Sequence, residues 1–375
     1  MLDFAFSSEH EMVRDTVRSF LADKASMTDV RKIMETESGF ANKLWDDLAE
    51  LGLLAVHIPE EYGGAGFTFL ELGIMMEEMG RAMTPVPFLS TVVLGAGVLL
   101  LAGDESQKAE LLPQIAAGNL RVALAITETD GDWDVGGTEC EAREAAGVVT
   151  LSGTKSFVID GHTADLLVVS ARDVTGQVSL YLVPADASGV QRARLETMDM
   201  TRKLAEVTLD GVEMPESSRL GAAGSAPESI ERLYDLATVA LAFEQVGGAQ
   251  ACLEASVEYA KVRHQFGRPI GSFQAIKHKC ADMLVQVESA KSTAYHAGWA
   301  ATADPAELLI AAPLAKSYCS DAFFDVAAEN IQVHGGIGFT WEHDAHLYFK
   351  RAKSSQLLFG DSARWRAKLA DRIGL

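Results

Sequence analysis

Residues 259–283 read YAKVRHQFGRPIGSFQAIKHKCADM, in which glycine and proline separate two helix-like halves. Gly267 and Pro269 interrupt the helical pattern, because proline removes a backbone donor and glycine favours a helix end. The end of one helix, a tight turn and the start of the next therefore expose Arg263, Gln265 and backbone groups together. An arginine at such a corner can neutralise a diphosphate through charge-assisted hydrogen bonds, or it can cap helix carbonyls.

Long helical segments lie on both sides of this corner. Apolar residues recur at helical spacing over residues 230–262, 273–302 and 306–333, which can pack as a bundle. The same spacing dominates residues 7–118, where the PEEYGGAG stretch at 59–66 marks a loop. The chain is therefore expected to begin and end with helical regions.

Between residues 121 and 221 the apolar period shifts towards two, which is typical of strands. The β-branched runs of this region lie at residues 148–151, 166–169 and 178–183. Short antiparallel strands in a sandwich or barrel fit this pattern best, and AAGSAP at 222–227 is a candidate hinge after them. We therefore predict an α+β multidomain chain. Its expected domains are an N-terminal all-α domain (1–120), a middle β domain (121–221) and a C-terminal helical bundle (222–375).

The 375 residues carry a formal net charge of −21, with acidic residues spread along the chain. Nucleic acid and anionic membranes are therefore disfavoured partners. The N-terminus has acidic residues where a secretory signal needs a basic start, and no apolar stretch approaches the roughly 18 residues of a membrane span. We expect a cytoplasmic protein without membrane insertion.

The cysteines and histidines predict neither a disulfide framework nor a metal site. The four cysteines are far apart and lack CxxC spacing. His334, His343 and His346 lack HExxH spacing and a companion pattern of carboxylates or cysteines. We interpret them as solvated or interface histidines.

The 259–283 segment resembles the signature segment of acyl-CoA dehydrogenases. A second match is QVHGGIGFTWEHDAHLYFKRAK at 332–353. Three further stretches occur in the order expected for that family: PEEYGGAG, ITE at 126–128 and LSGTKSFVIDGHTADLLVV at 151–169. The resemblance implies an N-terminal helical domain, a middle β domain and a C-terminal four-helix bundle.

The resemblance also implies an FAD cofactor. In the resembling enzymes the 259–283 segment reaches the FAD of the neighbouring subunit. This places Arg263 on the pyrophosphate, Gln265 and Phe266 beside the cofactor, and Gln274 near the adenosine half. A dimer or tetramer is implied.

Two further segments would contact the cofactor. Gln332, Gly335 and Gly336 would let backbone approach the diphosphate closely, which glycine permits. The remaining implied contacts come from the middle domain, at Ile126, Thr127 and Phe157. Three departures concern this domain: Asp132-Trp133-Asp134 stands where Gly-Ser-Asp is usual, Phe157 where a tryptophan covers the flavin, and Ile159 where a threonine commonly binds it.

Family chemistry removes the α-proton of an acyl-CoA thioester with a carboxylate while the β-hydrogen leaves as hydride to the flavin. The product is a trans-2-enoyl-CoA, and electrons pass to an external acceptor such as an electron-transfer flavoprotein. Many members place the base as a glutamate immediately before a glycine, where this chain has Phe359. Others place it early in the first long helix of the bundle, where this chain has Ala237 and Thr238.

Two nearby carboxylates are candidate substitutes. Glu244 lies seven residues, about two helical turns, beyond Ala237 and so on roughly the same face. Its apolar surroundings fit either a desolvated base with a raised pKa or a structural carboxylate. Asp361 lies two residues beyond Phe359 and is either a base or the N-cap of the last helix.

Three hypotheses follow for the activity. The first is a self-sufficient homodimeric or homotetrameric dehydrogenase of fatty or steroid acyl-CoAs that uses Glu244 or Asp361. The second is a base-lacking, FAD-sharing subunit that pairs with a second dehydrogenase-like chain, as in family members that attack sterol side chains. The third is a flavin oxidase on the same fold.

Overall fold

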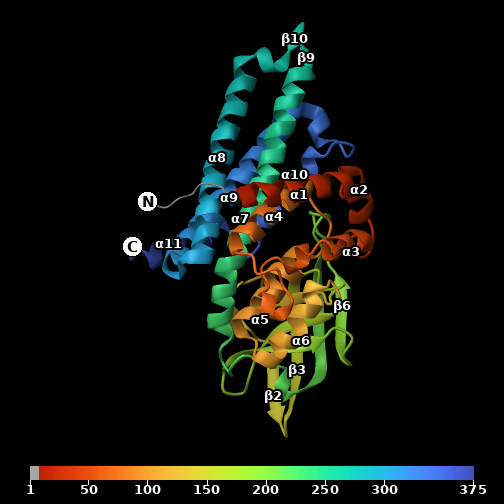
Figure 1. Ribbon diagram of the computed structural model, residues 1–375, viewed down its shortest axis with the longest axis vertical. Coiled ribbons are helices and arrows are strands. Elements are labelled where there is room, and N and C mark those ends of the chain that lie inside the picture. Colours follow the sequence, from red (N-terminus) through yellow and green to blue (C-terminus); the bar gives the residue numbers. More distant parts are fainter. Residues whose placement is uncertain (1–7) are drawn as a thin grey trace. The chain divides into compact units, whose positions relative to one another are not determined.

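The computed structural model describes residues 8–375 and divides into two compact units, each assembled from separated stretches of chain. The helical unit comprises the chain up to Arg31 together with Thr68–Thr84 and Thr238–Leu375. The sheet unit comprises Lys32–Phe67 and Pro85–Ala237. Figure 1 shows both units. The three sequence-contiguous domains are a different division of the chain and stay a prediction.

The helical unit combines helices from the C-terminal half of the chain, which form a bundle, with two helices from the N-terminal part. Its helices are α1 (Ser8–Lys24), α4 (Phe69–Ala82), most of α7 (Ala226–Val262), α8 (Gln274–Ala303), α9 (Pro305–His334), α10 (Ala345–Leu357) and α11 (Ser362–Arg372). Buried residues of α7, α8, α9 and α10 share one apolar core, which includes Cys252, Val287 and Phe323. The predicted C-terminal helical bundle is confirmed.

Glycines let α4 and α7 approach backbone to backbone within this unit. A Cβ at Gly247 would lie 1.8 Å from the carbonyl oxygen of Glu77, and one at Gly80 would lie 2.1 Å from that of Glu244. Any larger residue would force the helices apart, since real atoms do not approach so closely. The GG pair in the middle of α7 is therefore a packing requirement.

The sheet unit has one eight-stranded sheet with short helices. The helices are α2 (Met27–Met34, which starts in the helical unit), α3 (Asn42–Glu50), the π-helical turn Leu89–Gly95, α5 (Ala96–Ala102) and α6 (Glu105–Ala116). The strands are β1 (Val122–Ala125), β2 (Glu141–Ala145), β3 (Val148–Ile159), β4 (Leu166–Arg172), β5 (Val178–Pro184), β6 (Val190–Arg194), β7 (Leu204–Pro215) and β8 (Arg219–Leu220). The strand order is β6-β7-β3-β2-β4-β5-β8, and β1 pairs with β4.

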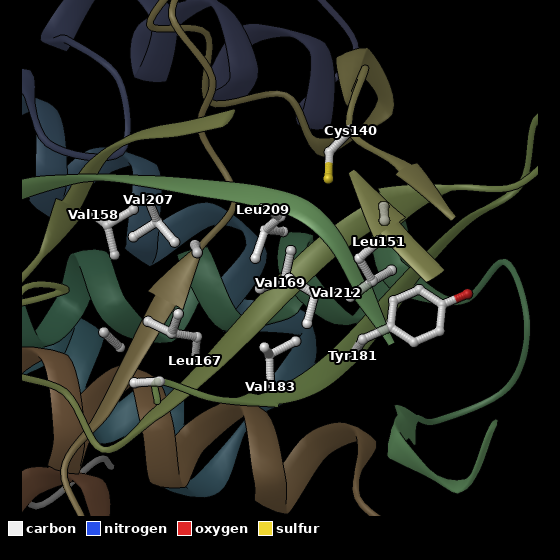
Figure 2. Packing of buried hydrophobic residues seen from close by; sticks show 14 of the residues in the cluster. Cys140, Leu151, Val158, Leu167, Val169, Tyr181, Val183, Val207, Leu209 and Val212 are labelled. Atoms are coloured by element: carbon white, nitrogen blue, oxygen red, sulfur yellow. The ribbon is translucent and has the colours of Figure 1, made fainter. Parts of the chain in front are cut away.

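Alternate side chains of these strands form the sheet's apolar core. In the β4–β5 pair, Leu167 faces Val183 and Val169 faces Tyr181, and all four side chains are buried. Figure 2 shows these residues with their neighbours from β3 and β7. The intervening residues, such as Val168 and Leu182, are buried as well, so β4 and β5 are covered on both faces.

Most pairings are antiparallel, as predicted, but β1 and β4 run parallel along Val122↔Leu166 to Ala125↔Val169. β2 and β4 also meet in parallel at one pair. Parallel neighbours need a crossover connection, and the β2–β3 hairpin lies between β1 and β4 in the chain. The sequence pattern gave no sign of this pairing, so the purely antiparallel expectation was wrong at this point.

One described helix, α7, is long and apolar enough to cross a membrane, but 83% of its most apolar window is buried within the protein. Core helices that never meet lipid pass the same test of length and composition. Its apolar character therefore reflects packing inside the protein.

Candidate functional site

The α7–α8 corner is a short hairpin that holds its polar and aromatic side chains out into solvent. Strands β9 (His264–Gln265) and β10 (Arg268–Pro269) pair antiparallel at the tip of the two helices, as Figure 1 shows. Phe266 in the turn has a left-handed φ of +53° and is 91% exposed. Arg263, Gln265 and Gln274 are also exposed. The corner is thus open to contact by a ligand or another chain.

The end of α9 places a second exposed segment beside the C-terminal end of α7. Gln332, Gly335 and Gly336 are exposed, whereas Gly338 is buried. The ring centroids of Tyr259 on α7 and His334 on α9 lie 4.3 Å apart. The two sequence segments that carry the family resemblance therefore meet at one end of the bundle.

The glycines of this segment are not needed for packing within the chain. A Cβ at Gly335 or Gly336 would meet no atom within 4 Å. Gly335 is required by its φ of +65°, whereas Gly336 lies outside the left-handed region. An open glycine backbone at the end of a helix is suited to close approach by an external group.

A single arginine fixes the loop that follows. Arg31 donates to Asp344 Oδ1 at 2.7 Å and to the carbonyls of Trp341 and His343 at 2.7 and 2.8 Å. Arg31 could not be selected from the sequence, because it lies more than 300 residues from its partners. No local pattern links such distant positions.

The three histidines of this region are packed rather than arranged as ligands. The rings of His334 and His343 have centroids 4.4 Å apart, and His346 stacks on Trp341. Burial lowers the pKa of each of these three histidines. Within residues 8–375, no group of three or more histidine, cysteine or acidic side chains could hold a metal ion.

In the sheet unit, the Ile126–Thr127 segment lies beside a bulge in β3. The β3–β7 register shifts between Lys155 and Val158, and Phe157 within this shift has a φ of +58° and is 38% exposed. The backbone N–H of Ser156 donates to the carbonyl of Thr127 at 2.8 Å. A bulge redirects side chains out of the strand's alternation. The structure thus brings Thr127 and Phe157 together, with the phenyl ring partly open to solvent.

The position of the family's glutamate base holds a buried aromatic residue. Phe359 is 2% exposed, has a φ of +61°, and accepts a hydrogen bond from Trp365 Nε1 on its carbonyl at 2.9 Å. The other family position, Ala237, is fully buried. Neither residue can accept a substrate proton on its side chain.

Both acidic candidates are engaged in structural contacts. The carboxylate of Asp361 accepts the backbone N–H of Arg364 at 2.9 Å, which confirms the N-cap alternative for this exposed residue. Glu244 is buried, and its Oε1 lies 3.4 Å from Nη1 of the equally buried Arg351. Sequence reasoning missed Arg351, which is 107 residues from Glu244 and on another helix.

Three family models match consecutive parts of the chain. The acyl-CoA dehydrogenase N-terminal domain matches residues 7–119, the middle domain residues 123–212 and the C-terminal domain residues 229–374. The chain is 35% identical over 355 residues to acyl-CoA dehydrogenase IpdE2 of Mycolicibacterium smegmatis. That match covers 94% of this chain and 95% of the relative.

Two solved structures share the fold over nearly the full length. The steroid acyl-CoA dehydrogenase Tcur3481–Tcur3483, solved as a G363A variant, has a TM-score of 0.87 and 33% identity over 97% of each chain. The ChsE4–ChsE5 complex of Mycobacterium tuberculosis has a TM-score of 0.90 and 27% identity over 99% of each chain. Both names join two components, and that of ChsE4–ChsE5 calls the pair a complex.

Proposed function

This chain belongs to the acyl-CoA dehydrogenase family, and on that premise we propose that it is the FAD-sharing subunit of a hetero-oligomeric acyl-CoA dehydrogenase. A second dehydrogenase-like chain carries the catalytic base. The assembly converts an acyl-CoA thioester to a trans-2-enoyl-CoA in the cytoplasm and passes electrons to an external acceptor such as an electron-transfer flavoprotein. The likeness to a steroid acyl-CoA dehydrogenase supports an acyl group attached to a steroid.

The observation that carries this proposal is that both nearby carboxylates are held by other groups. Asp361 caps α11, because its carboxylate accepts a backbone N–H of the first helical turn. Glu244 pairs with Arg351, with Oε1 and Nη1 3.4 Å apart, so its carboxylate is engaged in a buried ion pair. Phe359 stands where the family's usual glutamate would be. Among the described residues, the two acidic candidates, Glu244 and Asp361, are therefore both engaged in structural contacts.

The residues present fit FAD in each unit taken by itself. The open backbone at Gly335 and Gly336 suits a diphosphate, and the exposed ring of Phe157 beside Thr127 suits one face of an isoalloxazine. The bound flavin supplies a hydride acceptor. The exposed corner with Arg263 and Gln265 would reach the cofactor of an adjacent chain, as the family resemblance implies. In this arrangement the subunit binds and orients the cofactor while the partner moves the substrate proton.

A self-sufficient dehydrogenase is the second candidate, and one observation favours it. Glu244 is 6% exposed on a helix whose neighbouring residues are fully buried. A carboxylate in such surroundings can act as a base if substrate binding separates it from Arg351. This candidate requires flavin reduction without a partner chain.

Anaerobic substrate addition separates the two candidates. The chain would be purified alone and, through an affinity tag, as the assembly it forms in its native cells. Short, long, branched and steroid acyl-CoAs would then be added to each flavin-loaded sample. We expect bleaching of the visible flavin band only in the assembly that contains a second dehydrogenase-like chain. Bleaching by the chain alone would contradict the proposal, and rapid reoxidation by oxygen with peroxide formation would identify an oxidase.

A further inference from the structure

A fully buried lysine lies behind the Ile126–Thr127 segment. Lys155 on β3 donates to the carbonyl of Ile126 at 3.1 Å, to Glu128 Oε1 at 2.7 Å and to Ser170 Oγ on β4 at 2.9 Å. An ammonium group has three donors, and all three have acceptors here. One side chain therefore joins β3, β4 and the segment that follows β1.

Glu128 extends this network to a second loop. Its Oε1 also accepts the backbone N–H groups of Glu139 and Cys140, at 3.0 and 2.9 Å. Burial raises the pKa of the Glu128 carboxyl, but the hydrogen bonds from Lys155 and these amides outweigh it and hold the pKa below its usual range. The carboxylate stays ionised and ties the two loops to the lysine.

The network leaves the Ile126–Thr127 segment little freedom to shift. The carbonyl of Ile126 is held by Lys155, and that of Thr127 is held by the next residue of β3, Ser156. Phe157 follows directly at the bulge. A Cβ placed on Gly131, further along the same loop, would lie 3.6 Å from the ring of Phe157. The spacing between Thr127 and Phe157 therefore depends on Lys155 and Glu128.

We propose that the Lys155–Glu128 pair is a positioning device for the flavin, which sets the separation and orientation of Thr127 and Phe157. This inference rests on the proposed FAD-binding function. An ion pair needed only for stability could be replaced by apolar residues of similar volume, since buried pairs often add little net stability. Here the hydrogen bonds end on the segment and strand that carry the implied flavin contacts, so a disturbed pair should alter how the cofactor is held.

The decisive variant is Lys155→Met with Glu128→Gln, which removes both charges and leaves no buried ion alone. The matched control is Arg121→Met with Asp165→Asn, since Arg121 and Asp165 form an ion pair in the same unit at 2.8 Å, beside the start of β1 and β4. Ser170→Ala removes a single acceptor of Lys155 and gives a graded second test if the double variant does not fold.

Each variant would be made in the assembly in which the wild-type chain holds FAD. The measurements are thermal unfolding of the apoprotein, the dissociation constant of FAD by flavin fluorescence, and the visible circular dichroism of bound flavin. We expect the Lys155/Glu128 variant to bind FAD at least about tenfold more weakly with an altered flavin spectrum. Ser170→Ala should weaken FAD binding and alter the flavin spectrum in the same direction, but by less. The control variant should change neither FAD affinity nor the spectrum, even where its thermal stability matches that of the Lys155/Glu128 variant.

An unchanged dissociation constant and flavin spectrum in the Lys155/Glu128 variant, or equal changes in the control, would overturn the positioning role. A wild-type assembly without flavin would instead overturn the proposed function, and the inference with it.

Discussion

Nη1 of Arg351 on α10 lies 3.4 Å from Oε1 of Glu244 on α7, and neither side chain is more than 7% exposed. Burying two charges costs hydration free energy, and their mutual attraction offsets that cost only in part unless the geometry is excellent. The same contact opposes catalysis, since a base must be free to take a proton. The pair joins α7 to α10, and it also engages one of the two candidate bases of the chain.

Glu244→Gln should destabilise the protein far more than it slows catalysis. The variant takes one counter-charge away from the buried Arg351, and breaking a buried ion pair in this way costs about 3–5 kcal/mol. Urea unfolding of Glu244→Gln, Arg351→Gln and the double variant measures the coupling. The rate of flavin reduction in the assembly should change only a few-fold. A loss of about 100-fold or more in a folded Glu244→Gln protein would mark Glu244 as the base.

Phe359→Glu should give the isolated chain a base at the position the family uses. A positioned general base is worth roughly 10²–10⁴ in rate, so anaerobic flavin reduction by acyl-CoA should accelerate by that order in stopped-flow measurements. Phe359→Gln is the control, because it makes the same change in size and polarity without a proton acceptor. Equal rates for the two variants would show that the missing glutamate is not what limits the chain.

Asp361→Ala should lower the free energy of unfolding by about 1 kcal/mol, the usual value of a lost N-cap. Asp361→Asn should retain most of that stability, because its side-chain oxygen still accepts the N–H of Arg364. Both variants should reduce flavin at the wild-type rate in the assembly. A slow Asp361→Asn variant of normal stability would return this residue to the list of candidate bases.

Local patterns in the sequence predicted most of the fold. The helical period over residues 230–333 predicted the bundle helices, and the β-branched runs around Val169 and Tyr181 predicted β4 and β5, which are buried on both faces. The parallel β1–β4 pairing was not predictable, because it depends on how residues 44 apart are brought together by an intervening hairpin. Register between distant strands leaves no local periodic signal.

The candidate site divides in the same way. Gly335 and Gly336 could be selected through the family resemblance of the 332–353 segment, although GGIG alone lacks the GxGxxG spacing. Arg351 and Lys155 could not, since their importance comes from partners on other elements. A lysine within a strand is ordinarily expected to be exposed, and nothing in the sequence near Lys155 indicates that its side chain is buried.

His57 should make the sheet unit sensitive to mild acid. Burial lowers its pKa from 6.5 to about 4, and Nδ1 has no hydrogen-bond partner. The unfolded chain therefore binds a proton more readily than the folded chain, so stability is present above pH 6.5 and is lost as the pH falls towards 4. The loss amounts to about 3 kcal/mol, at roughly 1.4 kcal/mol per pKa unit.

Urea unfolding between neutral pH and pH 4 checks this dependence. His57→Gln should flatten this part of the profile. Parallel profiles for wild type and His57→Gln would mean that His57 takes up its proton in the folded state as readily as in the unfolded one.

Gly336→Ala should separate folding from cofactor binding. An added Cβ meets no protein atom within 4 Å, and the backbone needs no left-handed conformation, so the free energy of unfolding of the apoprotein should change by less than about 1 kcal/mol. If the diphosphate lies against this backbone, the methyl group occupies its place, and FAD affinity should fall at least about tenfold by fluorescence titration of the assembly. Gly137→Ala is the matched control, because it is also an open glycine outside the left-handed region and lies in the other unit. Wild-type FAD affinity in Gly336→Ala would place the diphosphate elsewhere, and Gln332 would then lose its proposed role along with the glycines.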